Sequence, residues 1–328
     1  MTGPSMWEWG IMGIFGRRKD IERDAQPAAM DESLTMFSQD ESDTFRARVR
    51  TRLAEMGYEV EVHPDQVVTD DGSHWGLWNL AANCHNDEAG PDGWEQTITT
   101  HFESLFAAKD AVSPLEAGLE ATLASIHTRL VDASQLRQLG EDRFSYGTEF
   151  APGVRQLLVL DTPTTIETPA EEHLTKVAPL ATLLDQGWRN TRALLDSTDV
   201  DVERIEHDDL TFTCVLGESV FIASMALFLP EAVARWQPDA DLSEGIIFSI
   251  PHRGQLNFAP AQPAQAALGG IMLMPKFAYL GYSDGAGGVS PHTYYWRDGV
   301  VTQLTEFTDE GANLTPGPDL ERILGTLE

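Results

Sequence analysis

The chain has 328 residues, of which 42% are hydrophobic, and its 22 Lys and Arg against 52 Asp and Glu give a formal net charge of −30. This length and hydrophobic content suffice for one large or two medium-sized domains with a buried core. A negative field of this size repels nucleic acid and anionic membrane surfaces, so we expect neither as a partner. It favours basic proteins or cations, although the charge can also serve solubility alone.

Cysteine usage and hydropathy narrow the class further. Cys84 and Cys214 are too few for a disulfide framework, and no Cys-x-x-Cys motif occurs. We therefore expect reduced, buried thiols in a cytoplasmic protein, with no metal and no cofactor. No run of 18 apolar residues occurs, so the sequence predicts no membrane span. Residues 1–31 lack periodicity and are expected to form a flexible leader.

Residues 32–150 are predicted to form an N-terminal, acidic α/β lobe. Its first helix begins at Ser33 or Asp40 and ends near Met56, because the apolar residues between follow a helical spacing. The further elements of this lobe are a strand at 58–62 continued at 66–68, a second strand at 74–82, a helix at 94–107 and a helix at 115–130. The first four elements follow the order α-β-β-α.

Residues 151–308 are predicted to form a C-terminal α/β lobe, followed by a polar tail at 309–328 that ends in a short helix. The elements of this lobe are a strand at 156–160, helix at 170–195, strands at 200–205 and 210–216, helix at 219–236, strands on both sides of residue 250, helix at 262–279 and a hairpin at 292–304. The order α-β-β-α recurs here. We therefore expect an α+β fold of two such halves, packed as mixed sheets with helices, and interpret them as a diverged internal duplication.

The first candidate site is an acidic surface on the N-terminal lobe. From residue 59 to residue 120 the chain has 13 acidic residues and one basic residue. Three tryptophans in the same segment argue for a folded lobe and against a disordered acidic tail. We therefore expect a surface that binds a basic protein. Its predicted residues are Glu59, Glu61, Asp87, Glu88, Asp92 and Glu95.

The second candidate site lies near residue 250, where an apolar strand ends at Pro251 and the pair His252-Arg253 follows. Arginine can bind a carboxylate or phosphate through its planar fork, and histidine can act as an acid, a base or a ligand. Asp161, at a predicted strand end, and Tyr294, in the predicted hairpin, complete this hypothesis, because ligand sites form at strand ends. The simpler interpretation is structural: Arg253 pairs with an acid, His252 holds a corner and Asp161 caps a helix.

Other patterns fall short of a chemical signature. Neighbours on a strand face opposite ways, so Cys84 and His85 do not suit one metal ion. The glycine-rich stretch at 281–288 lacks the lysine of a phosphate-binding loop, although it leaves a nucleotide or metabolite sensor as a weaker idea. Gly217-Glu218-Ser219 is not the nucleophile motif Gly-x-Ser-x-Gly.

Several short pieces occur in a characteristic order between residues 155 and 305. They are Gly187-Trp188-Arg189-Asn190, Cys214-Val215-Leu216-Gly217-Glu218, Ala223-Ser224, Pro251-His252-Arg253 and the hairpin turn Asp298-Gly299. In this order they resemble the YtpQ family, a bacterial domain of unknown function. The resemblance implies an α+β cytoplasmic protein and implies no reaction. The acidity of this chain and its longer leader and tail depart from the family, so a shared partner does not follow.

Two functional hypotheses stay open. The first is a non-enzymatic interaction protein, in an accessory or neutralising role, that binds a basic protein through the acidic surface. The alternative is a hydrolase-like or anion-binding enzyme with a site near Asp161, His252 and Arg253. We favour the first, because the sequence contains no nucleophile motif, metal-ligand set or phosphate-binding loop that would reinforce the second.

Overall fold

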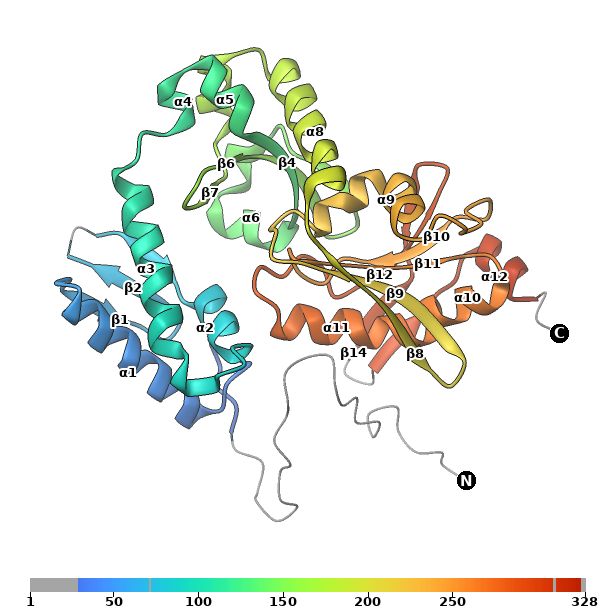
Figure 1. Ribbon diagram of the computed structural model, residues 1–328, viewed down its shortest axis with the longest axis horizontal. Helices are drawn as coiled ribbons and strands as arrows, with labels where there is room; N and C mark the ends of the chain where they lie inside the picture. The colour runs from blue at the N-terminus through green and yellow to red at the C-terminus, as the bar shows by residue number, and fades with distance from the viewer. Residues whose placement is uncertain (1–28, 71, 309–310, 326–328) are drawn as a thin grey trace. The chain divides into compact units, whose positions relative to one another are not determined.

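The computed structural model describes residues 29–70, 72–308 and 311–325. The fold is α+β, as predicted, and every strand pairing in these ranges is antiparallel (Figure 1). The chain divides into two compact units between Ser104 and Leu105. We call them unit 1, up to residue 104, and unit 2, from residue 105. The predicted leader at 1–31 falls almost entirely outside the described residues.

Unit 1 combines helices with a small sheet. Its first helix, α1 (Gln39–Glu55), begins after Ser38, whose side chain exchanges capping hydrogen bonds with Glu41. The helix ends before Gly57, whose φ of +88° suits glycine. The remaining elements are β1 (Val60–Val62), β2 (Gln66–Thr69), β3 (His74–Gly76), α2 (Trp78–His85), η1 (Gly90–Asp92) and the part of α3 (Trp94–Asp110) up to Ser104.

The middle of unit 1 differs from the sequence prediction in two ways. The segment at 66–68 does not continue the preceding strand but turns back as β2 and pairs with β1. The strand predicted at 74–82 ends as β3 at Gly76, and α2 takes over. The apolar residues at 77, 80, 81 and 84 explain this result, because they are all buried and their spacing is that of one helical face.

Aromatic packing holds the helices of unit 1 together. Phe37, Phe45 of α1 and Trp94 of α3 form a cluster with ring-centroid separations of 5.1 to 6.0 Å. The Trp94 indole Nε1 donates a hydrogen bond to the Cys84 carbonyl of α2 at 2.7 Å.

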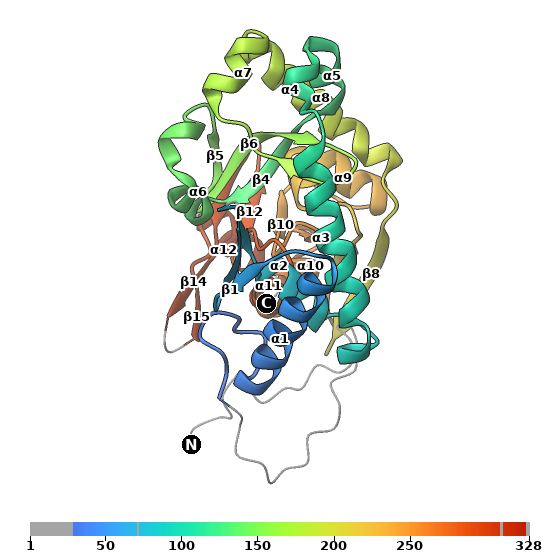
Figure 2. The ribbon, with the colours of Figure 1, turned by 90° about the vertical axis from the view of Figure 1, so that its left-hand side faces the viewer.

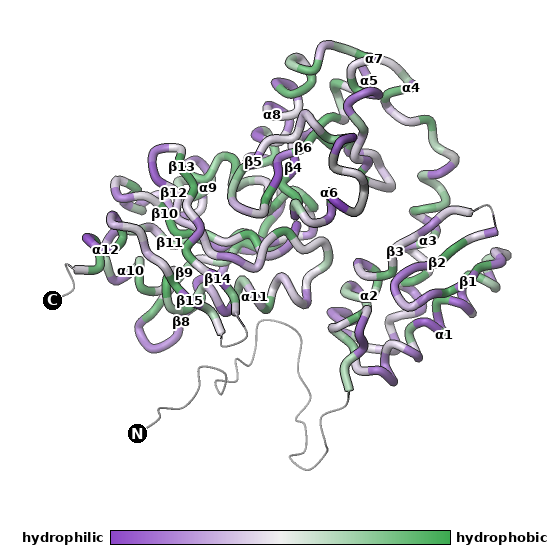
Figure 3. The backbone as a smooth tube through the Cα atoms, turned by 180° about the vertical axis from the view of Figure 1, so that it is seen from behind, coloured by the Kyte–Doolittle hydropathy of each residue, from purple (hydrophilic) through white to green (hydrophobic). Residues whose placement is uncertain are grey.

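Hydrophobic stretches run through β2 of unit 1 and through the central strands of unit 2 (Figure 3).

The larger sheet of unit 2 has six strands in the order β13-β12-β10-β11-β9-β8. Its central strands, β10 (Ile246–Ser249) and β11 (Gln255–Pro260), are buried along their whole length, so both faces of the sheet are covered here. The hairpins predicted on either side are confirmed. Their strands are β8 (Asp201–His207), β9 (Leu210–Leu216), β12 (Thr293–Arg297) and β13 (Val300–Gln303).

Helical segments cover both faces of this sheet (Figure 1). One face packs against η3 (Ala223–Phe228) and α9 (Leu229–Trp236), and the opposite face against α10 (Ala264–Leu268), η4 (Gly269–Leu273) and α11 (Met274–Asp284). The helix predicted at 262–279 is therefore three segments. Gly269 permits the closest approach, because a Cβ there would lie 1.9 Å from the carbonyl oxygen of Thr211 in β9.

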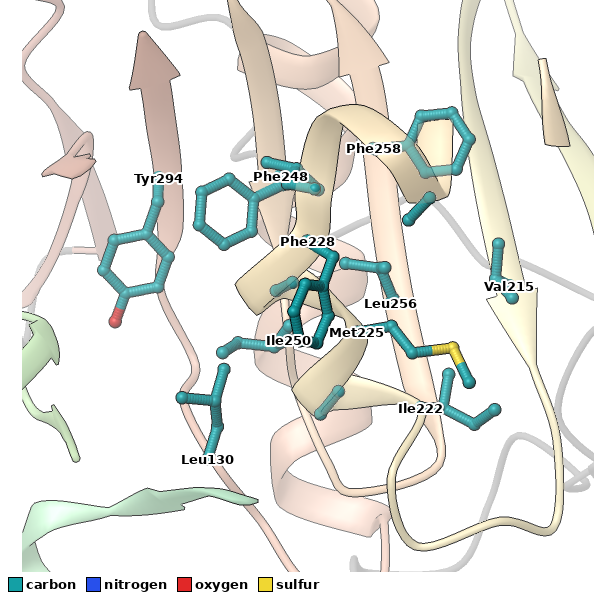
Figure 4. Close-up of a cluster of buried hydrophobic side chains, with 14 of the residues drawn as sticks. Leu130, Val215, Ile222, Met225, Phe228, Phe248, Ile250, Leu256, Phe258 and Tyr294 are labelled. Carbon is teal, nitrogen blue, oxygen red and sulfur yellow. The ribbon is translucent and has the colours of Figure 1, made fainter. Parts of the chain in front are cut away.

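The main core of unit 2 lies under η3 and α9. Side chains of η3 such as Met225 and Phe228 face Phe248 of β10, Leu256 of β11 and Ile250, which directly follows β10 (Figure 4). These sheet residues alternate along β10 and β11 with others that face α11, as the two-residue period of a strand requires. Burial on both faces explains the apolar run of β10, whereas the buried polar residues Gln255 and Asn257 of β11 are accommodated because they hydrogen-bond to each other and Asn257 donates to Ser249.

The smaller sheet of unit 2 corrects the predicted domain boundary. Its order is β4-β6-β5, with β7 also paired to β6. Its strands are β4 (Ile126–Asp132), β5 (Thr148–Ala151), β6 (Val154–Asp161) and β7 (Ile166–Glu167). The boundary predicted between 150 and 151 falls inside β5, whose partner β6 lies beyond it, so the prediction was wrong. The helix predicted at 115–130 is α4 (Pro114–Ala117) and α5 (Leu119–Ser125), after which β4 begins.

The free edge of β4 is capped by side chains from neighbouring helices. The backbone N–H of Thr128 donates to Thr191 Oγ1 of α8 (Leu180–Ser197) at 2.8 Å, and that of Leu130 donates to Ser224 Oγ of η3 at 3.0 Å. These bonds satisfy the edge and tie the smaller sheet to the layer that covers the larger one. Helices α4, α5, α7 (Glu171–Val177) and α8 gather beside the smaller sheet (Figure 2).

The remaining elements complete unit 2. They are α6 (Ala133–Leu139), η2 (Glu141–Phe144), β14 (Thr305–Thr308), β15 (Gly311–Leu314) and α12 (Pro318–Leu324). The predicted polar tail is thus folded where it is described: β15 pairs with β14, and α12 buries two of its side chains. The predicted duplication finds no support in the topology, because β1 and β2 form a separate three-stranded sheet whereas β8 and β9 belong to the six-stranded one.

Candidate functional site

The four residues predicted to form a site near residue 250 do not converge. Asp161 is exposed at the end of β6. The hydroxyl of Tyr294 donates to the Pro152 carbonyl at 3.0 Å, just before the other end of the same strand. Seven residue steps separate Val154 from Asp161, about 23 Å at about 3.3 Å per residue. One substrate atom therefore cannot contact both Asp161 and Tyr294.

Tyr294 is part of the hydrophobic core of unit 2. Its side chain is fully buried, and its ring lies 5.5 Å from that of Phe248 in a stacked arrangement. The hydroxyl is also 2.7 Å from Ser290 Oγ, so its hydrogen-bonding capacity is used within the protein. Burial raises the pKa of Tyr294 above its ordinary value. A neutral, enclosed phenol of this kind is a structural element of the sheet.

His252 holds the corner between β10 and β11. Its Nδ1 accepts a hydrogen bond from the Gly254 backbone N–H at 3.2 Å, and its backbone bridges to Gly288. Burial, aided by the neighbouring charge of Arg253, lowers the pKa of His252 to about 4. The imidazole is therefore neutral at pH 7. These contacts support the structural interpretation of His252 over a role in acid-base chemistry.

Arg253 differs from its neighbours, because it does not pair with an acid as the structural interpretation expected. Its backbone is held on both sides: its N–H donates to the Gly287 carbonyl at 2.9 Å, and its carbonyl accepts from Ala223 N–H at 3.0 Å. Within the described ranges its guanidinium has neither an ion pair nor a hydrogen bond. Burial lowers the pKa of Arg253.

Arg129 is a second unpaired arginine, and the sequence analysis missed it. It lies in the middle of β4, in a segment predicted to be helical. Its Nε is enclosed and has no hydrogen-bond partner among the described residues. Burial lowers the pKa of Arg129 to about 10, and the positive charge of Arg253 contributes to the shift. The two residues are also linked through η3, because Leu130 N–H, next to Arg129, donates to Ser224 Oγ and the adjacent Ala223 N–H donates to the Arg253 carbonyl, both at 3.0 Å. The available signal was an arginine inside an alternating, β-branched stretch, His127-Thr128-Arg129-Leu130-Val131.

The predicted acidic surface lies in unit 1, and five of its six carboxylates are exposed. The exception is Asp87, whose oxygens accept hydrogen bonds from the Ala89 N–H and the Thr97 hydroxyl, both at 3.0 Å. Asp87 therefore stabilises the turn before α3 and does not belong to the surface. The exposed members are Glu59, Glu61, Glu88, Asp92 and Glu95.

The arginines of α1 do not neutralise this surface, because most of them bind inside unit 1. Arg46 forms a two-pronged ion pair with Asp31, with both N–O distances at 2.9 Å. Arg48 donates to the Pro91 carbonyl and stacks over the Trp94 ring. Arg52 donates to Thr99 Oγ1 at 2.6 Å, and its nearest approach to the predicted surface is a 3.9 Å contact with Glu95.

The described residues also contain an aromatic cavity of about 460 Å³ in unit 2. Its wall includes Phe307, whose ring centroid lies 5.0 Å from that of Tyr279 and 5.5 Å from that of His292, and both of these residues also line the cavity. None of the predicted site residues lines it. Throughout the part of the chain that the structure describes, no cluster of His, Cys, Asp or Glu side chains has an arrangement that could hold a metal ion.

Both cysteines are buried and free, as predicted, and burial raises the pKa of each thiol to about 12. Among the described helices, none has the length and apolar character needed to cross a membrane.

Comparison with known proteins finds no matching family model, curated protein or solved structure. The resemblance to the YtpQ family therefore stays a prediction from the short sequence pieces.

Proposed function

We propose that this protein is a non-enzymatic interaction protein whose unit 1 binds a basic segment of a partner protein. The acidic surface is defined here as Glu59, Glu61, Glu88, Asp92 and Glu95. The observation that carries the proposal is that three arginines of α1 bind partners within unit 1. Arg46, Arg48 and Arg52 bind Asp31, the Pro91 carbonyl and Thr99, respectively.

The consequence is that three of these five carboxylates have no counter-charge in the described part of the chain, whereas Glu95 lies 3.9 Å from Arg52 Nη1. Glu59, Glu88 and Asp92 have no ion-pair partner among the described residues. Glu61 approaches only His63, at 3.6 Å. Exposed carboxylates of this kind attract a basic partner over a distance of about a Debye length, roughly 8 to 10 Å at physiological salt. They contribute mainly to the association rate and to specificity.

A defined basic peptide tests the proposal. Association of a fluorescent, arginine-rich peptide with the full chain should weaken steeply as salt rises, because surface charges are screened. Neutralising Glu59, Glu88 and Asp92 together, to Gln, Gln and Asn, should slow association at low salt about tenfold or more.

The matched control removes equal charge from unit 2, through Glu172→Gln, Glu203→Gln and Asp298→Asn, all at exposed positions. If both triple variants slow association equally, net charge alone is responsible and the proposed surface has no role. Co-purification from cells at low and high salt then asks whether a basic protein partner depends on the same three carboxylates.

The alternative, a hydrolase-like enzyme at Asp161, His252 and Arg253, has less support. Asp161 stands apart from the other candidates, and His252 is neutral and enclosed. The two buried, free cysteines support placing the protein in a reducing compartment, which we propose is the cytoplasm.

A further inference from the structure

Arg129 and Arg253 form an unusual pair for so acidic a chain. With 52 acidic residues against 22 basic ones, a carboxylate is available for almost any arginine. Most described arginines use one. Ion pairs are found at Arg46, Arg52, Arg189, Arg192, Arg204, Arg235, Arg297 and Arg322. Arg129 and Arg253 have no such partner in the described ranges, although both are more enclosed than an ordinary surface arginine.

Both arginines lie in segments bonded to the start of η3, since Ala223 N–H donates to the Arg253 carbonyl at 3.0 Å and Leu130 N–H, next to Arg129, donates to Ser224 Oγ at 3.0 Å. Leaving two like charges half-buried without a counterion is unfavourable, because each has lost part of its hydration and neither has gained a partner. The carboxylate of Asp132 on β4 does not help. Its oxygens accept hydrogen bonds from the Tyr282 hydroxyl at 2.9 Å and the Ser134 N–H at 2.7 Å. Three residues along the strand from Arg129, it also points to the opposite face.

The fold holds the pair in place from two directions. Arg129 is fixed by β4, which pairs with β6 over its whole length. Arg253 is fixed by its backbone bonds and by Gly287, where φ is +70° and a Cβ would lie 2.8 Å from Arg253 Cδ. The glycine therefore gives the arginine side chain room to lie against the loop. The Nε of Arg129 is fully enclosed without a partner among the described residues, whereas the other guanidinium nitrogens of Arg129 and Arg253 keep access to solvent.

We propose that Arg129 and Arg253 together bind the oxyanion group of a small ligand, a phosphate or a carboxylate, in unit 2. Both groups present oxygens that a guanidinium fork can bind with two parallel hydrogen bonds. Because two positive charges face the ligand, a divalent oxyanion neutralises the pair better than a monovalent one. The ligand also bridges the two sheets of unit 2, since Arg129 belongs to the smaller sheet and Arg253 to a corner of the larger one.

The site is independent of the acidic surface in unit 1, so each proposal can fail without the other. The test uses the full chain in a buffer free of oxyanions, with inorganic phosphate, sulfate, malonate or chloride added at equal ionic strength. Binding is measured by calorimetry and by the rise in Tm that a ligand of the folded state produces. Hydrogen exchange is followed in peptides covering 126–132 and 250–256, which the ligand should protect together.

Phosphate or sulfate should raise the Tm and protect both peptides more than chloride does. A stronger effect of malonate would assign the site to carboxylates, and a stronger effect of phosphate or sulfate to tetrahedral oxyanions. Arg129→Gln and Arg253→Gln should each weaken binding at least tenfold, because each removes one charged fork. The exposed Arg204→Gln, on β8, is the matched control and should bind as the original chain does.

The sign of the stability change separates a binding site from a structural pair. Without oxyanion, Arg129→Gln and Arg253→Gln should keep or raise the Tm, because each relieves repulsion between the two arginines. A purely structural role would lower the Tm in every buffer. The proposal is overturned if phosphate, sulfate and malonate act like chloride on the original chain, or if the control variant loses binding as the two site variants do. The measurements on the original chain decide this even if a variant fails to fold.

Discussion

Asp31 should govern the acid stability of unit 1, and Asp31→Asn tests this. Its side chain is buried, with a relative exposure of 4%. The carboxylate accepts two hydrogen bonds from Arg46 at 2.9 Å, one from the Ser42 hydroxyl at 2.7 Å, and two from the backbone N–H groups of Ser33 and Leu34 at 2.9 and 2.8 Å. This one side chain therefore joins the segment before α1 to the helix itself.

The expected cost of Asp31→Asn follows from these contacts. Removing one partner of a buried ion pair costs about 3–5 kcal/mol. Asparagine keeps one acceptor oxygen, and Arg46 keeps its two hydrogen bonds to the Pro64 carbonyl, at 3.1 and 2.8 Å. We therefore expect unit 1 to lose about 2–3 kcal/mol, close to the value of one or two charge-assisted hydrogen bonds.

The pH dependence gives a second, sharper expectation. The hydrogen bonds from Arg46 hold the pKa of Asp31 well below its usual range. The folded-state pKa is therefore lower than that of the unfolded chain, which is about 4. The stabilisation is complete above the unfolded value and is lost as the pH falls toward the folded one. Unit 1 should weaken below about pH 4, and Asp31→Asn should remove this part of the pH dependence.

Hydrogen exchange measures the two units separately. Peptides from α1 report on unit 1, and peptides from β9 provide the internal reference in unit 2. Asp65→Asn is the matched control, because Asp65 is exposed in the same unit. Unchanged protection of α1 in Asp31→Asn at pH 7, or the same loss of protection between pH 4 and pH 2 as in the original chain, would show that Asp31 does not govern the acid stability of unit 1.

Three further changes test the packing of unit 2 by denaturant unfolding. Gly269→Ala should cost about 3 kcal/mol or prevent folding, since its Cβ would overlap a backbone carbonyl of β9. The control Gly317→Ala, whose Cβ would lie in open space, should cost only about a few tenths of a kcal/mol. Equal costs would contradict the close packing of η4. The original chain should lose up to about 3 kcal/mol of stability as the pH falls from about 6.5 to about 4, because the folded His252 imidazole stays neutral while the unfolded one takes a proton. His252→Gln should abolish this loss. An unchanged pH profile in the variant would show that another group causes it. Ser224→Ala should cost about 1–3 kcal/mol, because it leaves the Leu130 N–H of β4 without its acceptor. The control Ser197→Ala, at an exposed position, should cost much less. An equal effect of both variants would argue against a stabilising role of the hydrogen bond at the edge of β4.

The candidate sites were predictable to different degrees. Arg253 was visible from the sequence, because an apolar strand ends just before it. Its neighbour Arg129 was not visible, since residues 115–130 appeared to form one helix. Asp87 was wrongly placed on the acidic surface, because a single sequence does not reveal that its carboxylate turns inward to Thr97. Exposure and partners of a side chain depend on segments distant in the sequence, which local patterns do not report.

Elements with local signals could be predicted from the sequence. The helices α1 and α3, the hairpin of β8 and β9 and the hairpin of β12 and β13 all follow from periodicity and turn residues within about twenty positions, although the cap of α1 is Ser38 and the prediction named Ser33 or Asp40 as its start. That residues 126–132 form a strand depends on contacts with distant segments. That segment becomes β4 because it pairs with β6 and receives capping hydrogen bonds from Thr191 and Ser224. The bond to Ser224 also links Arg129 to Arg253, because the adjacent Ala223 N–H donates to the Arg253 carbonyl, and contacts between segments so distant in the chain are not encoded by any local pattern.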